Sequence, residues 1–383
     1  MVKFATPVVA AAFVLAACGG TTDSTGGDSG STEAGGCPEG LSIGFVGALT
    51  GPDANLGVNI SNGAQLAVDE HNAESGACQV TLKPFDTQGS PDQATGLATQ
   101  AINDAKVVGI VGPAFSGESQ VADPLFNEAG LVSITPSATN PTLSEQGWKT
   151  FFRVLGNDAT QGPAAAKYIQ DTVKATKVFV VDDASTYGKG LADIVRSSLG
   201  SAKIGDDTVQ KGQTDFSGTV AAIRASGADA VFFGGYYAEA GLLLRQMRES
   251  GLTTTFVTDD GAKDDGLIEA AGANNAEGTI ITCPCLPPEE AEGSFAEDYE
   301  AKYKTAPATY SAEGYDAATI LLKGIADGKT TREGLLEWTA GYDEPGVTKQ
   351  LKFNDKGEPA DVVVWAYKVE GGKIVTDQSI SAS

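Results

Sequence analysis

Histidine is almost absent from this sequence: its 383 residues contain one, His71. A Ser-His-Asp or Cys-His arrangement is therefore poorly supported, and His71, on the apolar face of a predicted helix, is expected in the core or at its edge. The Gly-x-Ser-x-Gly motif of hydrolases is missing too. Metal ligands are equally scarce, because the sequence has no Cys-x-x-Cys. We expect neither catalysis nor a metal site.

The sequence also lacks a complete phosphate-binding loop. Gly188, Lys189 and Gly190 follow a predicted strand and open a helix, as a Gly-x-Gly-x-x-Gly loop would. The third glycine position is occupied by Asp193, whose side chain and negative charge would lie near a pyrophosphate. No nucleotide or other cofactor is therefore predicted.

Basic residues are few relative to acidic ones, with 26 Lys and Arg against 50 Asp and Glu and a formal net charge of −24. A strongly acidic surface argues against nucleic acid and anionic membranes as partners. It is typical of the solvated surface of a secreted protein, and it gives no information about a ligand.

The apolar run at residues 1–17, MVKFATPVVAAAFVLAA, is too short to span a bilayer. One Lys, an apolar stretch and then small residues are the layout of a secretory signal peptide. Leu15 to Cys18 resembles the lipobox at which bacterial lipoproteins are cut and lipidated; the alternative is an ordinary signal peptide with an incidental Cys18. Two acyl chains on Cys18 would give a stable membrane anchor. Residues 18–36 have no large apolar side chain and are predicted to form a flexible tether.

Four cysteines remain after Cys18, and a secreted chain can form disulfides. Cys37 and Cys78 each lie shortly before an apolar run. If those runs are neighbouring parallel strands, the two cysteines share one edge of the sheet and a bridge between them is geometrically reasonable. Cys283 and Cys285 could close a tight ring or stay reduced.

Short β-rich runs alternate with helical patterns from residue 42 onward, which favours βαβ units and parallel sheets. One series ends near residue 135, and a second begins at residue 160 and ends near residue 282. Helices expected near 290–303, 309–326 and 331–340 have no strands between them, and VVVWAYKV at 362–369 reads as a lone late strand. These later elements must join sheets that are already formed.

The sequence therefore predicts an α/β fold of two Rossmann-like lobes with parallel sheets, joined by a hinge of several strands. We expect the chain to cross between the lobes at about 153–156, 283–288 and 346–352. The first predicted lobe is 37–154 with 284–348, and the second is 155–283 with 349–383.

Small hydroxyls and aromatic residues recur just after the predicted strands of both lobes. In open α/β sheets ligands lie outside the carboxyl ends of the strands, and between two lobes they lie in the cleft. Hydroxyls and loop amides can hold a carboxylate, whereas a loop carbonyl and one acid can hold an ammonium. The set comprises Phe115 and Ser116, Ser137 and Thr139 of SITPSATNP, Tyr187, Tyr236, Tyr237, Asp259 and Asp260.

Several stretches between residue 42 and about residue 370 resemble, in order and spacing, the type I periplasmic binding proteins of branched-chain amino acid ABC transporters. They are IGFVGALTGPDANLG, GLVSITPSATNPTL, RVLGNDATQGPAAAKYI, STYGKGLA, FFGGYYAEAGLLLRQMRESGL and LKFNDKGE. The resemblance implies a Cys37–Cys78 bridge only loosely, because the disulfide of this Leu/Ile/Val-binding group lies at other positions.

The same resemblance implies a ligand-binding set. Ser116 and Thr139 would hold the ligand carboxylate. The Ser137 carbonyl and the Thr139 hydroxyl would take the ammonium, helped by Asp260 from the second lobe. Tyr187 and Tyr236 would close over the ligand from the second lobe. The remaining members are Ala138, and Phe115, Tyr310 and Leu56 at the side-chain pocket.

Two residues of the implied ligand site depart from the family pattern. Leu56 stands where branched-chain binders carry an aromatic residue, and Asp260 stands where they carry Glu. Leucine, isoleucine or valine is therefore a preference rather than a deduction.

We interpret the chain as the extracytoplasmic substrate-binding component of an ABC importer. It would bind a free amino acid between its lobes and deliver it to the permease subunits. We expect a monomer on the outer face of the bacterial cell membrane, attached only through the lipid on Cys18. One alternative is a sensor of the same fold for another amino acid, a small amide or an aromatic acid. The other, an enzyme, is disfavoured by the missing catalytic motifs.

Overall fold

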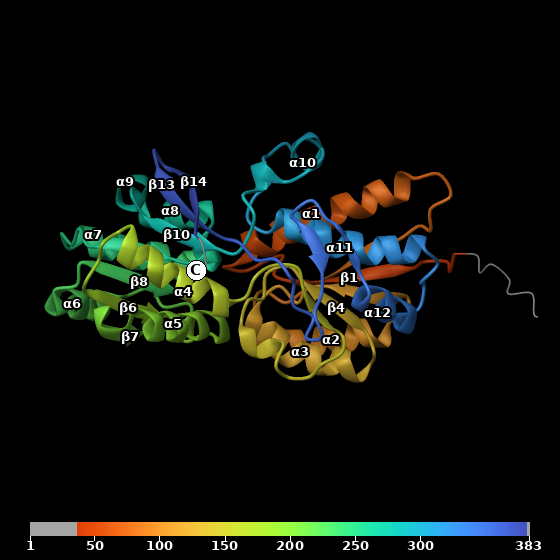
Figure 1. Cartoon of the computed structure of the whole chain (residues 1–383), viewed down its shortest axis with the longest axis horizontal. Helices are drawn as coiled ribbons and strands as arrows, with labels where there is room; N and C mark the ends of the chain where they lie inside the picture. The colour runs from red at the N-terminus through yellow and green to blue at the C-terminus, as the bar shows by residue number, and fades with distance from the viewer. Residues whose placement is uncertain (1–36, 381–383) are drawn as a thin grey trace, which may run out of the picture. The chain divides into compact units, whose positions relative to one another are not determined.

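The computed structural model describes residues 37–380. The predicted signal peptide, the tether and the lipidation site Cys18 lie outside these residues. Figure 1 shows strands and helices alternating along the chain. The first series is β1 (Ser42–Gly47), α1 (Ala54–Ala73), β2 (Thr81–Asp86), α2 (Pro91–Asn103), β3 (Val107–Val111), α3 (Ser116–Glu128), β4 (Val132–Thr135) and β5 (Phe151–Arg153).

The second series follows directly and builds a separate sheet. It is α4 (Asp158–Asp171), β6 (Val178–Asp182), α5 (Thr186–Leu199), β7 (Lys203–Thr208), α6 (Ser217–Ser226), β8 (Ala230–Gly234), α7 (Tyr237–Glu249), β9 (Thr255–Thr258), α8 (Asp265–Ala271), α9 (Ala273–Ala276) and β10 (Ile280–Cys283). The last elements are α10 (Phe295–Tyr303), α11 (Ser311–Ala326), α12 (Arg332–Ala340), β11 (Asp343–Pro345), β12 (Gln350–Lys352), β13 (Val364–Glu370) and β14 (Lys373–Ile380).

Five strands form the first sheet, in the order β2-β1-β3-β4-β5, with every pair parallel. Its central strand β3, VVGIV, is buried along its whole length, as expected for a parallel strand covered on both faces. Helices α1 and α11 lie side by side (Figure 1) and approach very closely. A Cβ added at Gly63 would lie 1.9 Å from the Ser311 carbonyl oxygen, so this crossing requires glycine. The elements around this sheet are called the first lobe.

Seven strands form the second sheet, in the order β14-β13-β10-β9-β8-β6-β7. The pairs from β6 to β10 are parallel, which confirms the predicted two-sheet α/β fold. The elements around this sheet are called the second lobe. Among the residues that the structure describes, no helix is long and apolar enough to cross a membrane.

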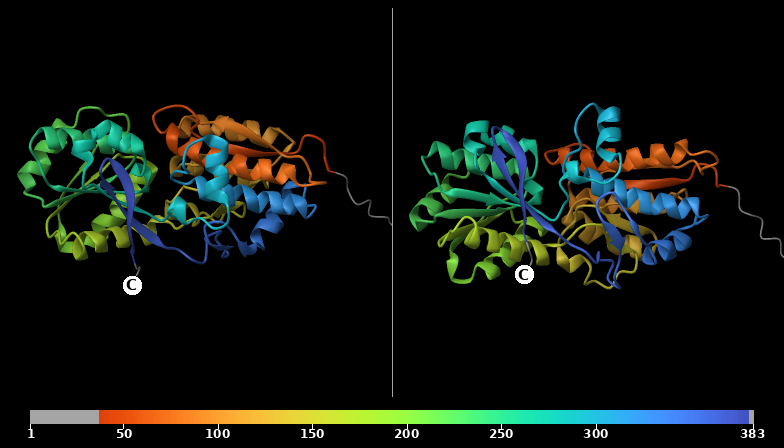
Figure 2. Two further views of the ribbon diagram at one scale, coloured as in Figure 1. Left: turned by 90° about the horizontal axis from the view of Figure 1, so that it is seen from above. Right: turned by 45° about the horizontal axis from the view of Figure 1, so that its top comes forward.

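The late strand predicted at 362–369 is not alone. β13 pairs antiparallel with β10 on one side and with β14 on the other, so it is the first arm of a hairpin at the sheet edge (Figure 2). Gly371 and Gly372 turn the hairpin with φ of 59° and 76°, values that glycine adopts without strain. The turn residues Gly-Gly were the missed signal for the second arm.

The third connection between the lobes lies later than the predicted 346–352. β12 pairs with β11, Phe353 bridges to Pro359, and the Arg153 amide of β5 donates to the Gly357 carbonyl at 2.9 Å. The Arg153 guanidinium also forms a buried ion pair with Glu358 at 2.5 Å. Residues 350–359, placed in the second lobe by the sequence, are therefore held against the first.

Both cysteine pairs are joined in the structure. The Cys37–Cys78 disulfide ties the start of the described chain to the segment before β2, and Cys283–Cys285 lies at the second connection between the lobes. His71 is buried on α1, and its Nε2 lies 2.9 Å from the Cys78 carbonyl oxygen.

Candidate functional site

A small buried cavity lies at the carboxyl ends of the strands of both sheets. Residues after β3 and β4 reach it from the first lobe, and residues after β6, β8 and β9 reach it from the second. Eight of the ten predicted ligand-binding residues line it; Ala138 and Thr139 do not. Ala114 and Gly261 are lining residues that the sequence did not single out. The full lining is Leu56, Ala114, Phe115, Ser116, Ser137, Tyr187, Tyr236, Asp260, Gly261 and Tyr310.

The loop after β4 is joined to the loop after β3 by its own hydroxyls. Thr135 Oγ1 donates to the Pro113 carbonyl at 2.7 Å and accepts from the Ala138 amide at 2.9 Å. Ser137 Oγ donates to the Ala114 carbonyl at 2.6 Å. The Ser137 hydroxyl therefore holds the loop in shape, which leaves its carbonyl as the group available to a ligand.

Thr139 is fully buried beyond the cavity wall. Its carbonyl accepts from the Asp158 amide at 2.9 Å, while its Oγ1 makes no hydrogen bond with any described residue. The Thr139 side chain lies near the buried Asp158 carboxyl, whose pKa it lowers against the effect of burial, and it does not reach the cavity in this structure.

Ser116 is the first residue of α3, so the first free amides of that helix lie at the cavity. Helix N-termini favour anions because their amides are unpaired and the dipole is positive there. Ser116 Oγ also accepts from the Asn140 amide at 3.2 Å, which links the two first-lobe loops. This wall can therefore accommodate a carboxylate.

Asp260 is the acid of the opposite wall. Tyr187 donates its hydroxyl to Asp260 Oδ1 at 2.7 Å, and Tyr310 donates to Oδ2. Asp260 is 1% exposed, and burial raises the pKa of its carboxyl against these two hydrogen bonds. Tyr310 reaches it from the first lobe with a left-handed backbone, φ 68°, which costs a non-glycine residue about 1 kcal/mol or more.

Aromatic rings close the cavity. The Phe115 ring from the first lobe meets the Tyr236 ring from the second edge-on, with 5.5 Å between centroids. The Tyr187 ring centroid lies 5.3 Å from the Tyr236 ring centroid. All three are at most 5% exposed, so the cavity is sealed from solvent on this side.

Further acids lie around the cavity without lining it. Both side-chain oxygens of Asp158, the first residue of α4, lack a hydrogen-bond partner among the described residues. Burial, together with the charge of Asp260, raises the pKa of Asp158 to about 8. Asp259 Oδ2 accepts from the Gly235 amide at 2.9 Å, and burial raises its pKa as well. The region favours a cation over an anion, whereas the α3 wall favours the reverse.

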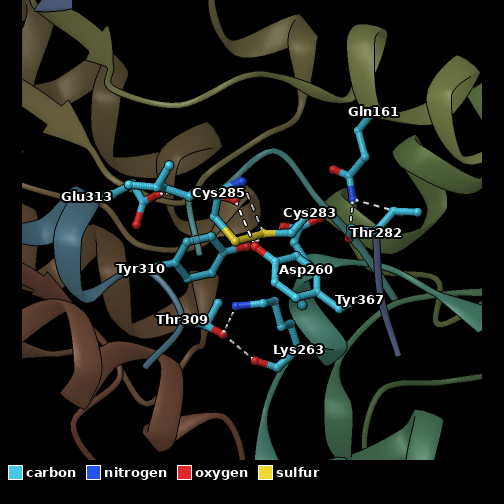
Figure 3. Close-up of a disulfide and its surroundings, with 12 residues drawn as sticks. Gln161, Asp260, Lys263, Thr282, Cys283, Cys285, Thr309, Tyr310, Glu313 and Tyr367 are labelled. Carbon is cyan, nitrogen blue, oxygen red and sulfur yellow. Dashed lines mark hydrogen bonds between the residues drawn. A yellow bond between two sulfur atoms is a disulfide. The ribbon is translucent and has the colours of Figure 1, made fainter. Parts of the chain in front are cut away.

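The second connection between the lobes passes directly behind this acid. Figure 3 shows the Cys283–Cys285 disulfide beside Asp260 and Tyr310. This connection is fixed to the second lobe by Tyr367, whose hydroxyl donates to the Cys285 carbonyl at 3.2 Å. It is fixed to the first lobe by Glu313, which accepts from the Leu286 amide at 2.9 Å.

No group of three or more His, Cys, Asp or Glu within residues 37–380 is arranged to hold a metal ion. The cavity thus lies between two α/β lobes, with the start of α3 on one wall and the buried Asp260 on the other. The chain belongs to the periplasmic binding protein family, whose sequence pattern matches residues 40–373.

Individual relatives agree with this assignment. An amino acid binding protein of Pseudomonas aeruginosa is 33% identical over 338 residues, which are 86% of this chain and 90% of that protein. The Leu/Ile/Val-binding protein BraC3 of Rhizobium johnstonii is 32% identical over 343 residues, or 88% and 93% of the two chains. Among solved structures, this chain is similar to LivJ of Streptococcus pneumoniae, a branched-chain amino acid transporter substrate-binding protein in complex with isoleucine. The TM-score is 0.81 at 28% identity, and the match covers 88% of this chain and all of that one.

Proposed function

We propose that this chain is the extracytoplasmic substrate-binding component of an ABC importer and that it holds an amino acid in the cavity between its lobes. The observation that carries the proposal is the opposition of two walls across one buried cavity. Ser116 at the start of α3 in the first lobe offers donors, and Asp260 of the second lobe offers a buried carboxylate. The relatives' names, an amino acid binding protein and a Leu/Ile/Val-binding protein, support the same ligand class.

Each end of the amino acid has a place in this arrangement. The ligand carboxylate accepts from Ser116 at the start of α3 and, once the wall in front of it moves, from Thr139, which does not line the cavity in this structure. The ammonium donates to the Ser137 carbonyl, the Thr139 hydroxyl and Asp260. Hydrogen bonds to charged groups are worth roughly 1.5 to 3 kcal/mol each, so a few of them suffice for micromolar affinity after association costs.

The ligand side chain then points into an apolar part of the cavity formed by Leu56, Ala114, Phe115 and Tyr310. Within residues 37–380, no charged side chain other than that of Asp260 lines the cavity. A branched aliphatic side chain suits this lining, and the isoleucine held by the Streptococcus pneumoniae relative supports the preference.

The partners follow from the same role. We infer that the signal peptide at residues 1–17 is removed, that Cys18 is lipidated, and that a monomer is held at the outer face of the bacterial cell membrane to deliver its ligand to permease subunits. Intact mass of the protein made in its host checks the first two points. An uncleaved chain or an unmodified Cys18 would refute the anchor.

Thermal unfolding with a panel of single L-amino acids tests the ligand class. A ligand present at about 1,000 times its Kd stabilises the folded state by about 4 kcal/mol, which shifts the midpoint by several degrees. We expect the largest shift with leucine, isoleucine or valine. Leucinamide, which lacks the carboxylate, and 4-methylpentanoate, which lacks the ammonium, are matched controls and should give little shift.

Four other outcomes would change the proposal. A flat panel of amino acids would refute it. A large shift with an aromatic acid or an amide would retain the fold's role and replace the ligand. Turnover of any compound in the panel would make the chain an enzyme. If reconstituted permease and ATPase are not stimulated by the loaded protein, the sensor reading is preferred.

A further inference from the structure

Lys211, in the loop between β7 and α6 of the second lobe, is bound to the first lobe. Its Nζ lies 2.6 Å from Oδ2 of Asp53, a residue in the loop before α1. The same Nζ donates to the Gly89 carbonyl, after β2, at 3.2 Å. Both partners belong to the first lobe, so these contacts exist only while the lobes are together.

The lysine also lies on the aromatic rings that seal the cavity. Its Nζ is 4.5 Å from the Tyr236 ring centroid and 5.7 Å from that of Phe115. Those two rings, one from each lobe, meet edge-on and line the cavity, whereas Lys211 does not line it. Lys211 therefore connects the two lobes, and it contacts the Phe115–Tyr236 ring pair from outside the cavity.

Burial makes this ion pair consequential. The Asp53 side chain is 1% exposed and that of Lys211 is 30% exposed, so the carboxylate has lost its water and depends on the ammonium. Lys211 faces further acids as well. Burial raises the pKa of Glu118 to about 8 and that of Asp183 to about 6, and the charge of Lys211 opposes both shifts. Burial also raises the pKa of Glu239, and Lys211 opposes that rise too.

We propose that Lys211 is a positioning residue that locks the two lobes over the ligand and sets how long the ligand stays bound without touching it. This rests on the proposed function, because it assigns Lys211 a part in retaining the amino acid. The lock is the Asp53–Lys211–Gly89 contact together with the Phe115–Tyr236 ring pair beneath it.

Lys211→Met tests the lock, because methionine keeps an apolar stem over the rings and removes the charge. We expect the ligand dissociation rate to rise about 5- to 10-fold, with the association rate nearly unchanged, since opening limits release. Asp53→Asn should act similarly, and the double variant should be no worse than the worse single variant. Lys189→Met is the matched control, because its ion pair with Asp193 lies within α5 of the second lobe.

Stopped-flow binding of the amino acid with the largest thermal shift, at low and high salt, gives these rates. Salt should speed release from the wild type and from Lys189→Met, and have less effect on Lys211→Met. Ligand-free unfolding midpoints show that each variant is folded. If Lys211→Met is misfolded, Asp53→Asn decides.

Small-angle scattering of the ligand-free variants separates this proposal from the proposed function. Failure of every amino acid to bind the wild type would refute the proposed function. The lock would then be tested by scattering alone, and we expect a larger radius of gyration for Lys211→Met than for Lys189→Met. Release rates and radii of gyration equal to those of the wild type would overturn the lock.

Discussion

Replacing Asp260 by asparagine is the most direct test of the ammonium site. The carboxylate is buried, accepts hydroxyls from Tyr187 and Tyr310, and forms no ion pair with any described Lys, Arg or His. The buried Lys263 lies close enough to feel the charge of Asp260, but a ligand ammonium would supply a cation in direct contact. Losing one charge-assisted hydrogen bond costs roughly 1.5 to 3 kcal/mol, which corresponds to an affinity about 10- to 150-fold weaker. Titration calorimetry with the best amino acid measures this.

The stability of the same variant should move the other way. Burial raises the pKa of Asp260, so its ionised form destabilises the folded state at neutral pH. Asp260→Asn should therefore leave the ligand-free unfolding midpoint unchanged or higher while ligand binding weakens. Asp123→Asn, another buried carboxyl, is the control and should bind normally. Binding within about threefold of wild type by Asp260→Asn would refute the assigned role of this residue.

Three further predictions concern stability. Burial raises the pKa of Glu118 and Asp158 to about 8, so the folded protein keeps these protons to a higher pH than the unfolded chain does. The free energy of unfolding should fall from about pH 5 to about pH 8.5, by up to about 1.4 kcal/mol per pH unit for each titrating group, and urea unfolding that shows a rise instead would contradict this. Arg153→Met should lower the free energy of unfolding by about 3 to 5 kcal/mol, because it leaves Glu358 unpaired. Lys356→Met, which breaks an exposed ion pair with Glu145, should lower it by at most about 1 kcal/mol. Equal losses in urea unfolding would show that burial is not the cause. Serines in place of Cys37 and Cys78, which are 41 residues apart, should cost about 4 kcal/mol, and serines in place of Cys283 and Cys285, only 2 apart, less than half of that; chemical denaturation of the two double variants compares them.

Local patterns predicted much of this fold. Continuous apolar runs such as VVGIV and AVFFG predicted buried parallel strands, because such strands are covered on both faces of the sheet. The second arm of the hairpin, β14, was missed because KIVTDQSI mixes polar and apolar residues, and this strand exists through pairing with β13. The third connection was misplaced because Glu358 joins β5 through Arg153, a partner 205 residues away.

The candidate site divides in the same way. Ser116, Tyr187 and Asp260 follow strands directly, so the rule that ligands lie at carboxyl ends of strands places them at one cavity. Asp158 follows a strand too, yet it resembles an ordinary residue at the start of a helix. Nothing local in the sequence pairs Lys211 with Asp53, because their contact depends on how two separately folded lobes meet.

The Asp260 carboxylate, which accepts hydrogen bonds from two tyrosines, also affects which relatives of an amino acid can bind. An amino acid and its 2-oxo acid share a carboxylate and a side chain and differ only in whether an ammonium or a carbonyl stands at Cα. In the oxo acid that carbonyl would face Asp260, and the ionised carboxylate would then meet a second acceptor in a buried space, with no proton between them. A carrier built on this contact would take up reduced nitrogen together with the carbon skeleton and leave the deaminated skeleton outside.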